Sequence, residues 1–197
     1  MSEKFAMADL TGGEMNALVK TVGGSTVVRQ ILRGEVVVRV TKGLLEEFGP
    51  MTQTRAIANF VARNKFVVDV QGELPIWSMN ASFRAYFLDV IELDVPFAML
   101  KQNKLLKPAF NADILAALGD TTKIEKARVA LAHVFSYLKT ADHRFWFLFY
   151  VADAEGIIWA VHASWHVGGW EIHAFPNSNS GEWRENIYVI SYGFFVS

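Results

Sequence analysis

The stretch Ile157–Phe175, IIWAVHASWHVGGWEIHAF, decides the fold of the chain's C-terminal third. Apolar and polar residues alternate on both sides of Gly168-Gly169, and this two-residue period is typical of β-strands. A type I′ turn needs positive φ at both central positions, which glycine adopts without strain. The pattern therefore predicts a hairpin whose two strands meet at Gly168-Gly169.

The predicted turn also sets the register of the hairpin, because cross-strand partners share a face of the sheet. Val167 is expected opposite Trp170 and Ser164 opposite His173, which makes His162 a diagonal neighbour of His173. One face then collects Trp159, Val161, Ala163, Trp165, Val167, Trp170, Ile172 and Ala174, and the other collects His162, Ser164, His166, Glu171, His173 and Phe175.

The polar face carries residue types that bind metals or perform hydrolysis. His162 and His173 are close enough as diagonal neighbours to share a zinc ion. A Ser-based hydrolytic site would use Ser164 as nucleophile, His173 as base and Glu171 as the acid. The favoured interpretation is a half-solvated polar sheet face without a metal or other cofactor, with zinc binding and hydrolysis as the alternatives.

The tryptophans of the other face are expected to pack in the core, since large aromatic side chains dominate core packing. If that face were open, it would suit a sugar, a base or an apolar peptide. Trp183 follows a polar loop that begins at Pro176, and recognition residues concentrate in loops. Trp183, Phe175 and Trp170 are therefore the binding candidates.

Composition excludes several classes of function. The chain has 197 residues, of which 52% are hydrophobic, and this argues against disorder. It has no cysteine, which rules out disulfides, thiolate zinc sites, iron–sulfur clusters and a cysteine nucleophile. The 19 basic and 20 acidic residues nearly balance, so nucleic acid is not an expected partner.

Apolar segments are too short for a membrane span. The longest, Phe145–Ala152, is far below the roughly 20 residues that a spanning helix needs. The first residues show no signal-peptide pattern, and a soluble cytoplasmic protein with no membrane partner is expected. The sequence leaves monomer and dimer open.

The chain is expected to form a single α+β domain, 1–197, with a mainly helical part at 1–64 and an α+β core at 65–197. The C-terminal third is expected to be an antiparallel β-meander of about four strands. His133 lies off the apolar stripe of the longest predicted helix and is expected to face solvent. Helices are predicted at 14–22, 25–33, 44–48, 54–62, 81–88, 113–118 and 124–139, and strands at 36–40, 65–70, 74–79, 90–93, 105–110, 145–151, 157–167, 170–175 and 187–196.

The segment Arg29–Val38, RQILRGEVVV, preceded by Gly23-Gly24, resembles the "GG…FLRGEL-V" signature of a family of uncharacterised bacterial proteins. Ile-Leu stands here where that signature has Phe-Leu, and the resemblance spans most of the chain except about 41–64. It implies a shared fold and supplies no activity. The similarity resumes at Asn80–Leu88, Ile114–Gly119, the helix predicted at 124–139, Trp165–Trp170 and Glu182-Trp183.

No Walker loop, strand-borne G-x-G-x-x-G, H-E-x-x-H, EF-hand loop or G-x-S-x-G elbow occurs in the sequence. The favoured function is a non-catalytic binding or interaction module that uses its Trp-rich sheet or the Trp183 loop. Its partner would be a protein or a small molecule. The alternative is a metal-assisted or Ser-based hydrolase built on the polar face of the hairpin.

Overall fold

The computed structural model describes residues 43–119, 127–178 and 181–195, all within the compact unit Gly43–Ser197. The elements predicted at 14–22, 25–33 and 36–40 lie outside these ranges. No helix in the described ranges is long and apolar enough to cross a membrane. The elements are β1 (Leu45–Glu47), β2 (Thr52–Thr54), β3 (Ile57–Val61), α3 (Ala62–Lys65), β4 (Ile76–Met79), α4 (Ala81–Phe87), β5 (Ile91–Val95), β6 (Ala98–Leu105), α5 (Asn111–Ala117), α6 (Leu131–Leu138), β7 (Phe147–Ala152), β8 (Ile158–His166), β9 (Gly169–Pro176) and β10 (Tyr188–Phe195).

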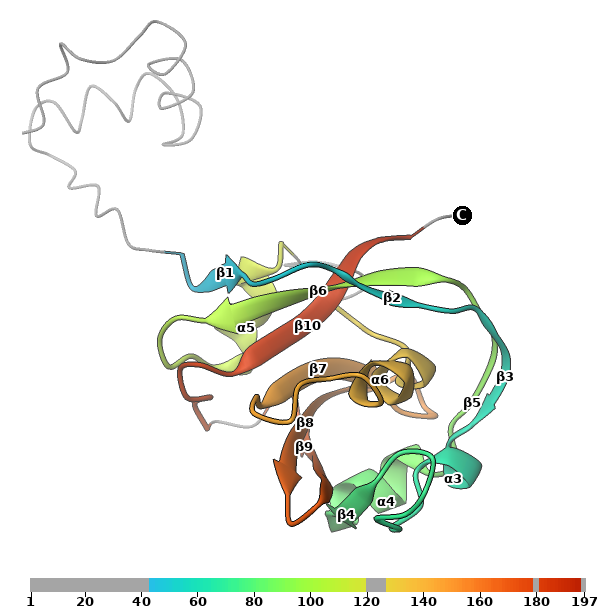
Figure 1. Ribbon diagram of the computed structural model, residues 1–197. Helices are drawn as coiled ribbons and strands as arrows, with labels where there is room; N and C mark the ends of the chain where they lie inside the picture. Colours follow the sequence, from blue (N-terminus) through green and yellow to red (C-terminus); the bar gives the residue numbers. More distant parts are fainter. Residues whose placement is uncertain (1–42, 120–126, 179–180, 196–197) are drawn as a thin grey trace, which may run out of the picture. The chain divides into compact units, whose positions relative to one another are not determined.

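Eight of the strands form one mixed sheet in the order β1-β6-β10-β7-β8-β9-β4, with β2 also paired to β6 (Figure 1). The α+β prediction is confirmed, and β7, β8 and β9 form the expected antiparallel meander. The prediction that β10 continues this meander is wrong, because β10 lies parallel to β7. β4 is likewise parallel to β9 at the sheet's edge, and β3 and β5 form a separate two-stranded ribbon.

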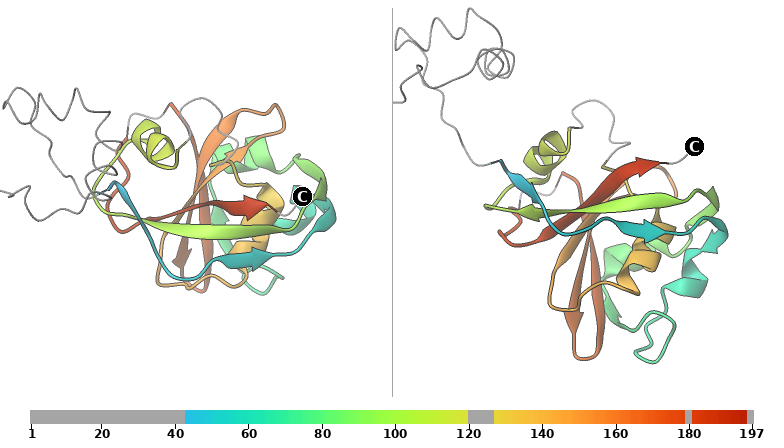
Figure 2. Two further views of the ribbon diagram at one scale, coloured as in Figure 1. Left: turned by 90° about the horizontal axis from the view of Figure 1, so that it is seen from above. Right: turned by 45° about the horizontal axis from the view of Figure 1, so that its top comes forward.

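Both faces of the central strands are covered. The sheet curls around α6, which packs against its inner face, whereas α5 lies on the opposite side (Figures 1 and 2). Along β7, Phe147 and Phe149 join the larger core with α6, and Leu148 and Tyr150 join the smaller core with α5. All six residues of β7 are buried, which confirms the prediction of a central strand covered on both faces.

The β8–β9 hairpin turns one residue earlier than the glycine pair predicts. Val167 and Gly168 adopt positive φ, 46° and 88°, and His166 pairs with Gly169. The predicted pairing is therefore wrong by two positions: His162 lies opposite His173, and Ser164 lies opposite Glu171. A shift of two keeps the strand side chains on their own faces, so the predicted separation of the two faces is confirmed along β8 and β9. Val167, predicted on the apolar face, is instead an exposed turn residue.

Gly169 is needed for strand packing rather than for the turn. A Cβ atom at this position would lie 2.7 Å from the Trp77 nitrogen and 3.1 Å from the Ile76 carbonyl carbon, both on the adjacent strand β4. Backbone atoms cannot move aside as a flexible side chain can. Only glycine therefore lets β4 approach β9 this closely.

Replacing Gly169 by alanine is expected to destabilise the protein by about 1–3 kcal/mol, because the new methyl group pushes β4 away from β9. Amide hydrogen exchange should rise at Trp77 and Ser78. Gly156→Ala is the matched control, since Gly156 has a φ of 83° but open space around a Cβ. That variant should lose stability without faster exchange in β4; equal exchange in both variants would contradict the close-approach argument.

The helix predicted at 124–139 is wrong in length, because α6 begins only at Leu131. Before it, Val129 donates its backbone N–H to the Tyr150 carbonyl (2.7 Å), so the chain runs extended beside β7. The Glu92 carboxylate then accepts hydrogen bonds from the backbone N–H groups of Leu131 (2.9 Å) and Ala132 (2.8 Å). A carboxylate from a distant strand thus accepts hydrogen bonds from backbone N–H groups in the first turn of α6 that have no partner within the helix.

His133 is fully buried, so the prediction of a solvent-facing His133 is wrong. The Pro96 carbonyl lies 2.9 Å from Nε2 and can only accept a hydrogen bond, so Nε2 donates to it. Nδ1 accepts from the Tyr192 hydroxyl at 2.9 Å, and that hydroxyl accepts from the Ala130 backbone N–H. Burial lowers the pKa of His133, and the imidazole serves as a neutral structural link.

The N-terminal half contains more strand than predicted. The helices predicted at 44–48 and 54–62 are wrong, because β1 and β2 pair with β6 and β3 pairs with β5. The strand predicted at 65–70 is a helix end and a loop, and the one predicted at 105–110 lies earlier, as β6. Pairing partners distant in sequence decide these segments, and local propensity does not reveal them.

Two short helices match the sequence. Asn80 caps α4 as predicted, with its side-chain oxygen 2.9 Å from the Phe83 backbone nitrogen. α5 ends before Gly119, which has a φ of 86°. The strands predicted at 74–79, 90–93, 157–167, 170–175 and 187–196 correspond to β4, β5, β8, β9 and β10 within a few residues.

Candidate ligand-binding pocket

A pocket at the inner side of the sheet is enclosed by three segments that are far apart in sequence. They are the connection between β1 and β2, strand β6, and the C-terminal end of α6 with the loop into β7. Gly49, with a φ of 71°, and Pro50 turn the chain between β1 and β2. The Phe48 backbone N–H donates to the Gln102 carbonyl (2.9 Å), which holds this turn against β6. The cavity has a volume of about 210 Å³.

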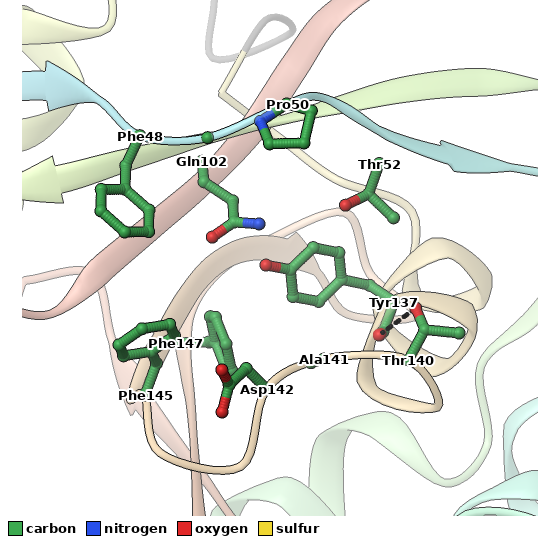
Figure 3. A pocket seen from close by; sticks show the side chains of 11 residues that line it. Phe48, Pro50, Thr52, Gln102, Tyr137, Thr140, Ala141, Asp142, Phe145 and Phe147 are labelled. Atoms are coloured by element: carbon green, nitrogen blue, oxygen red, sulfur yellow. Dashed lines mark hydrogen bonds between the residues drawn. The ribbon is translucent and has the colours of Figure 1, made fainter.

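Aromatic rings form most of its wall (Figure 3). Phe48 meets Phe145 edge-on with 5.9 Å between ring centroids, and both contact Tyr188, at 4.9 and 4.6 Å. Tyr137 meets Phe147 edge-on at 5.2 Å. Because the rings support one another in this geometry, the wall is preformed. We call this site the aromatic pocket and define it by Phe48, Thr52, Gln102, Tyr137, Asp142, Phe145 and Phe147.

The Tyr137 hydroxyl points into the aromatic pocket (Figure 3). Only 2% of this residue is exposed, and the hydroxyl makes no hydrogen bond with any other residue that the structure describes. Burial raises the pKa of Tyr137, so the hydroxyl stays protonated and able to donate. The hydroxyl is open to the cavity, so a bound molecule can take the hydrogen bond that water would otherwise make there.

Asp142 lies at the floor of the pocket and is held by its neighbour in the loop. Arg144 donates to it from its backbone N–H, from Nε and from Nη2. These hydrogen bonds lower the pKa of Asp142 to about 2, so the carboxylate is ionised at neutral pH. The Arg144 guanidinium also lies 5.6 Å from the centre of the Phe145 ring.

The residues predicted for a metal or hydrolytic site lie on the opposite face of the sheet. His173 Nε2 lies 3.4 Å from Glu171 Oε1, which accepts a hydrogen bond from the Ser78 hydroxyl at 3.3 Å. Ser164 faces Glu171 across the hairpin and hydrogen-bonds to no histidine among the described residues. Within that same portion of the chain, no three His, Cys, Asp or Glu side chains are grouped to hold a metal ion.

His162 is enclosed by aromatic rings. Trp183 stacks on it with centroids 5.7 Å apart, and Trp146 meets it edge-on at 5.6 Å. Its Nε2 atom is buried and has no partner among the described residues. Burial, followed by the nearby His173, lowers the pKa of His162 to about 4. At neutral pH the ring is uncharged and packs as an aromatic side chain.

The three predicted binding residues are divided between the two faces. Trp183 and Phe175 contact each other, with 5.6 Å between ring centroids, on the polar face near His162. Trp183 Nε1 donates to Asn111 Oδ1 at 2.6 Å, which holds its ring in place. Trp170 is fully buried in the core on the other face, where its Nε1 donates to the Leu138 carbonyl.

No local pattern in the sequence indicates the aromatic pocket. Its residues come from 48–52, 102 and 137–147, and local patterns place Phe48 and Tyr137 in helices. Two local features of the sequence belong to the pocket, the Phe-Gly-Pro turn at 48–50 and the pair of Asp142 with Arg144 in a loop. Neither indicates a shared cavity until the sheet brings the segments together.

Comparison with family profiles, with curated proteins and with solved structures finds no match to this chain.

Proposed function

We propose that the chain is a non-catalytic binding module that takes a small molecule into the aromatic pocket. The observation that carries this proposal is Tyr137, a buried residue whose hydroxyl points into the cavity and makes no hydrogen bond with another described residue. Preformed, mainly apolar walls with a few converging polar groups are typical of small-molecule sites.

The chemistry of the lining supports binding rather than catalysis. None of the eleven lining residues is a histidine, cysteine, serine or lysine, the residue types most often used as nucleophile or base. Asp142, the one carboxylate, is neutralised by Arg144. The Trp-rich face of the hairpin is a less suitable binding surface, because Trp159 and Trp170 are buried in the core. The loop that carries Trp183 is a second candidate surface for a partner.

A blocking substitution tests the proposal. Thr52→Phe places a ring inside the aromatic pocket, whereas Gln53→Phe places the same ring on the exposed side of the same strand. Saturation-transfer NMR with phenol and indole should detect binding to the unmodified protein and to Gln53→Phe, with dissociation constants in the millimolar range expected of such small ligands. Thr52→Phe should weaken binding at least tenfold. Equal signals from the two variants, or no binding by the unmodified protein, would refute the proposal.

A further inference from the structure

Besides the ionised Asp142, and Thr140, whose hydroxyl donates to the Tyr137 carbonyl, three uncharged polar side chains line the aromatic pocket. They are the Tyr137 hydroxyl, the Gln102 carboxamide and the Thr52 hydroxyl (Figure 3). Each carries both a hydrogen-bond donor and an acceptor. The Gln102 carboxamide, like the Tyr137 hydroxyl, makes no hydrogen bond within the part of the chain that the structure describes. The site thus offers complementary groups to a ligand that itself donates and accepts.

The ion pair of Asp142, which lines the pocket, with Arg144, which lies outside it, disfavours an ionic ligand. An anion would meet the ionised Asp142, which lines the pocket. A cation would have to compete for that carboxylate with Arg144, which lies outside the lining and already pairs with it. Either ion would also lose water to an aromatic wall, which is costly without a dedicated counter-charge. A neutral ligand avoids both penalties.

The dimensions fit one ring with a small substituent. A volume of about 210 Å³ holds about seven water molecules at roughly 30 Å³ each. Edge-on and tilted rings such as Phe48, Phe145 and Phe147 present faces and edges against which a flat ring packs well. This space is too small for a ligand of two fused rings with long side arms.

We propose that the aromatic pocket binds a single planar aromatic ring that carries an uncharged carboxamide-type edge. The ligand carbonyl would accept a hydrogen bond from the Tyr137 hydroxyl, and its N–H would donate to Gln102 Oε1. This inference rests on the proposed function and adds the chemical class of the ligand.

The inference is tested with four compounds of nearly equal size that each carry one benzene ring: benzamide, benzoate, benzylamine and ethylbenzene. Dissociation constants are measured by titration in two-dimensional NMR, with shift changes followed at residues around the pocket. Benzamide should bind at least tenfold more tightly than benzoate and benzylamine. It should bind about tenfold to a hundredfold more tightly than ethylbenzene, since it makes two neutral hydrogen bonds that each contribute about threefold to tenfold.

Variants assign the hydrogen bonds. Tyr137→Phe removes only the hydroxyl and should weaken benzamide about threefold to tenfold while leaving ethylbenzene binding unchanged. Gln102→Leu should act in the same way. Tyr86→Phe is the matched control, because Tyr86 is exposed, packs on Trp159 and takes no part in the pocket.

The outcomes separate this inference from the proposed function. If benzylamine binds most tightly, the aromatic rings recognise a cation. If ethylbenzene and benzamide have equal dissociation constants, the pocket selects ligands by shape alone. Either result overturns the carboxamide assignment and leaves a binding pocket. If none of the four rings shifts residues of the pocket, the proposed function fails as well.

Discussion

Replacing Trp170 by alanine is expected to lower the free energy of unfolding by about 3–5 kcal/mol and the melting temperature by about 10 °C or more. The indole is fully buried and donates a hydrogen bond to the Leu138 carbonyl at 3.2 Å, which ties β9 to the end of α6. It also meets Trp165 edge-on at 5.3 Å and Phe147 at 5.9 Å. The truncation leaves a large cavity and an unpaired carbonyl.

Trp77→Ala is the matched control for this experiment. Trp77 lies on β4, next to β9 in the same sheet, but 44% of it is exposed. Its removal should change stability by less than about 1 kcal/mol in urea denaturation. If both variants unfold at the same urea concentration, Trp170 is not a core residue, and the assignment of the two hairpin faces is wrong.

Lowering the pH from 7 to 5 is expected to destabilise the protein, with about 2 kcal/mol of the loss due to His162 alone. Burial lowers the pKa of His162 to about 4 in the folded state, compared with about 6.5 in the unfolded chain. Between these values the unfolded chain binds a proton that the folded protein does not. The contribution of His162 to stability is therefore fully present above about pH 6.5 and is lost as the pH falls toward 4. His133, whose pKa is also lowered by burial, adds to the same trend.

His162→Phe should remove most of this pH dependence, because a phenyl ring can stack on Trp183 without taking up a proton. Glu73→Gln serves as the control. Hydrogen bonds from Lys139 and Lys65 lower the pKa of Glu73 to about 2, so its stabilising effect is lost only below about pH 4.5. Chemical denaturation at pH 7, 6 and 5 gives the comparison. If the free energy of unfolding of His162→Phe depends on pH as steeply as that of the unmodified protein, the imidazole of His162 takes up a proton in the folded state as readily as in the unfolded chain.

The sequence by itself determined the features that depend on near neighbours. The alternation in 157–175 assigned each side chain of the hairpin to its face, and Asn80 and Gly119 marked the start of α4 and the end of α5. The run Phe145–Val151 identified the central strand. In each case the residue's own conformational preference, or a period of two, is sufficient.

Only the tertiary structure decided the rest, because the deciding partner lies far along the chain. Glu92 sets where α6 begins, and Pro96 with Tyr192 makes His133 a buried link. Gly169 packs against β4, and the turn at Val167-Gly168 places His162 opposite His173. The aromatic pocket arises in the same way, since β6 and the end of α6 carry Gln102 and Tyr137 to one cavity that no local pattern encodes.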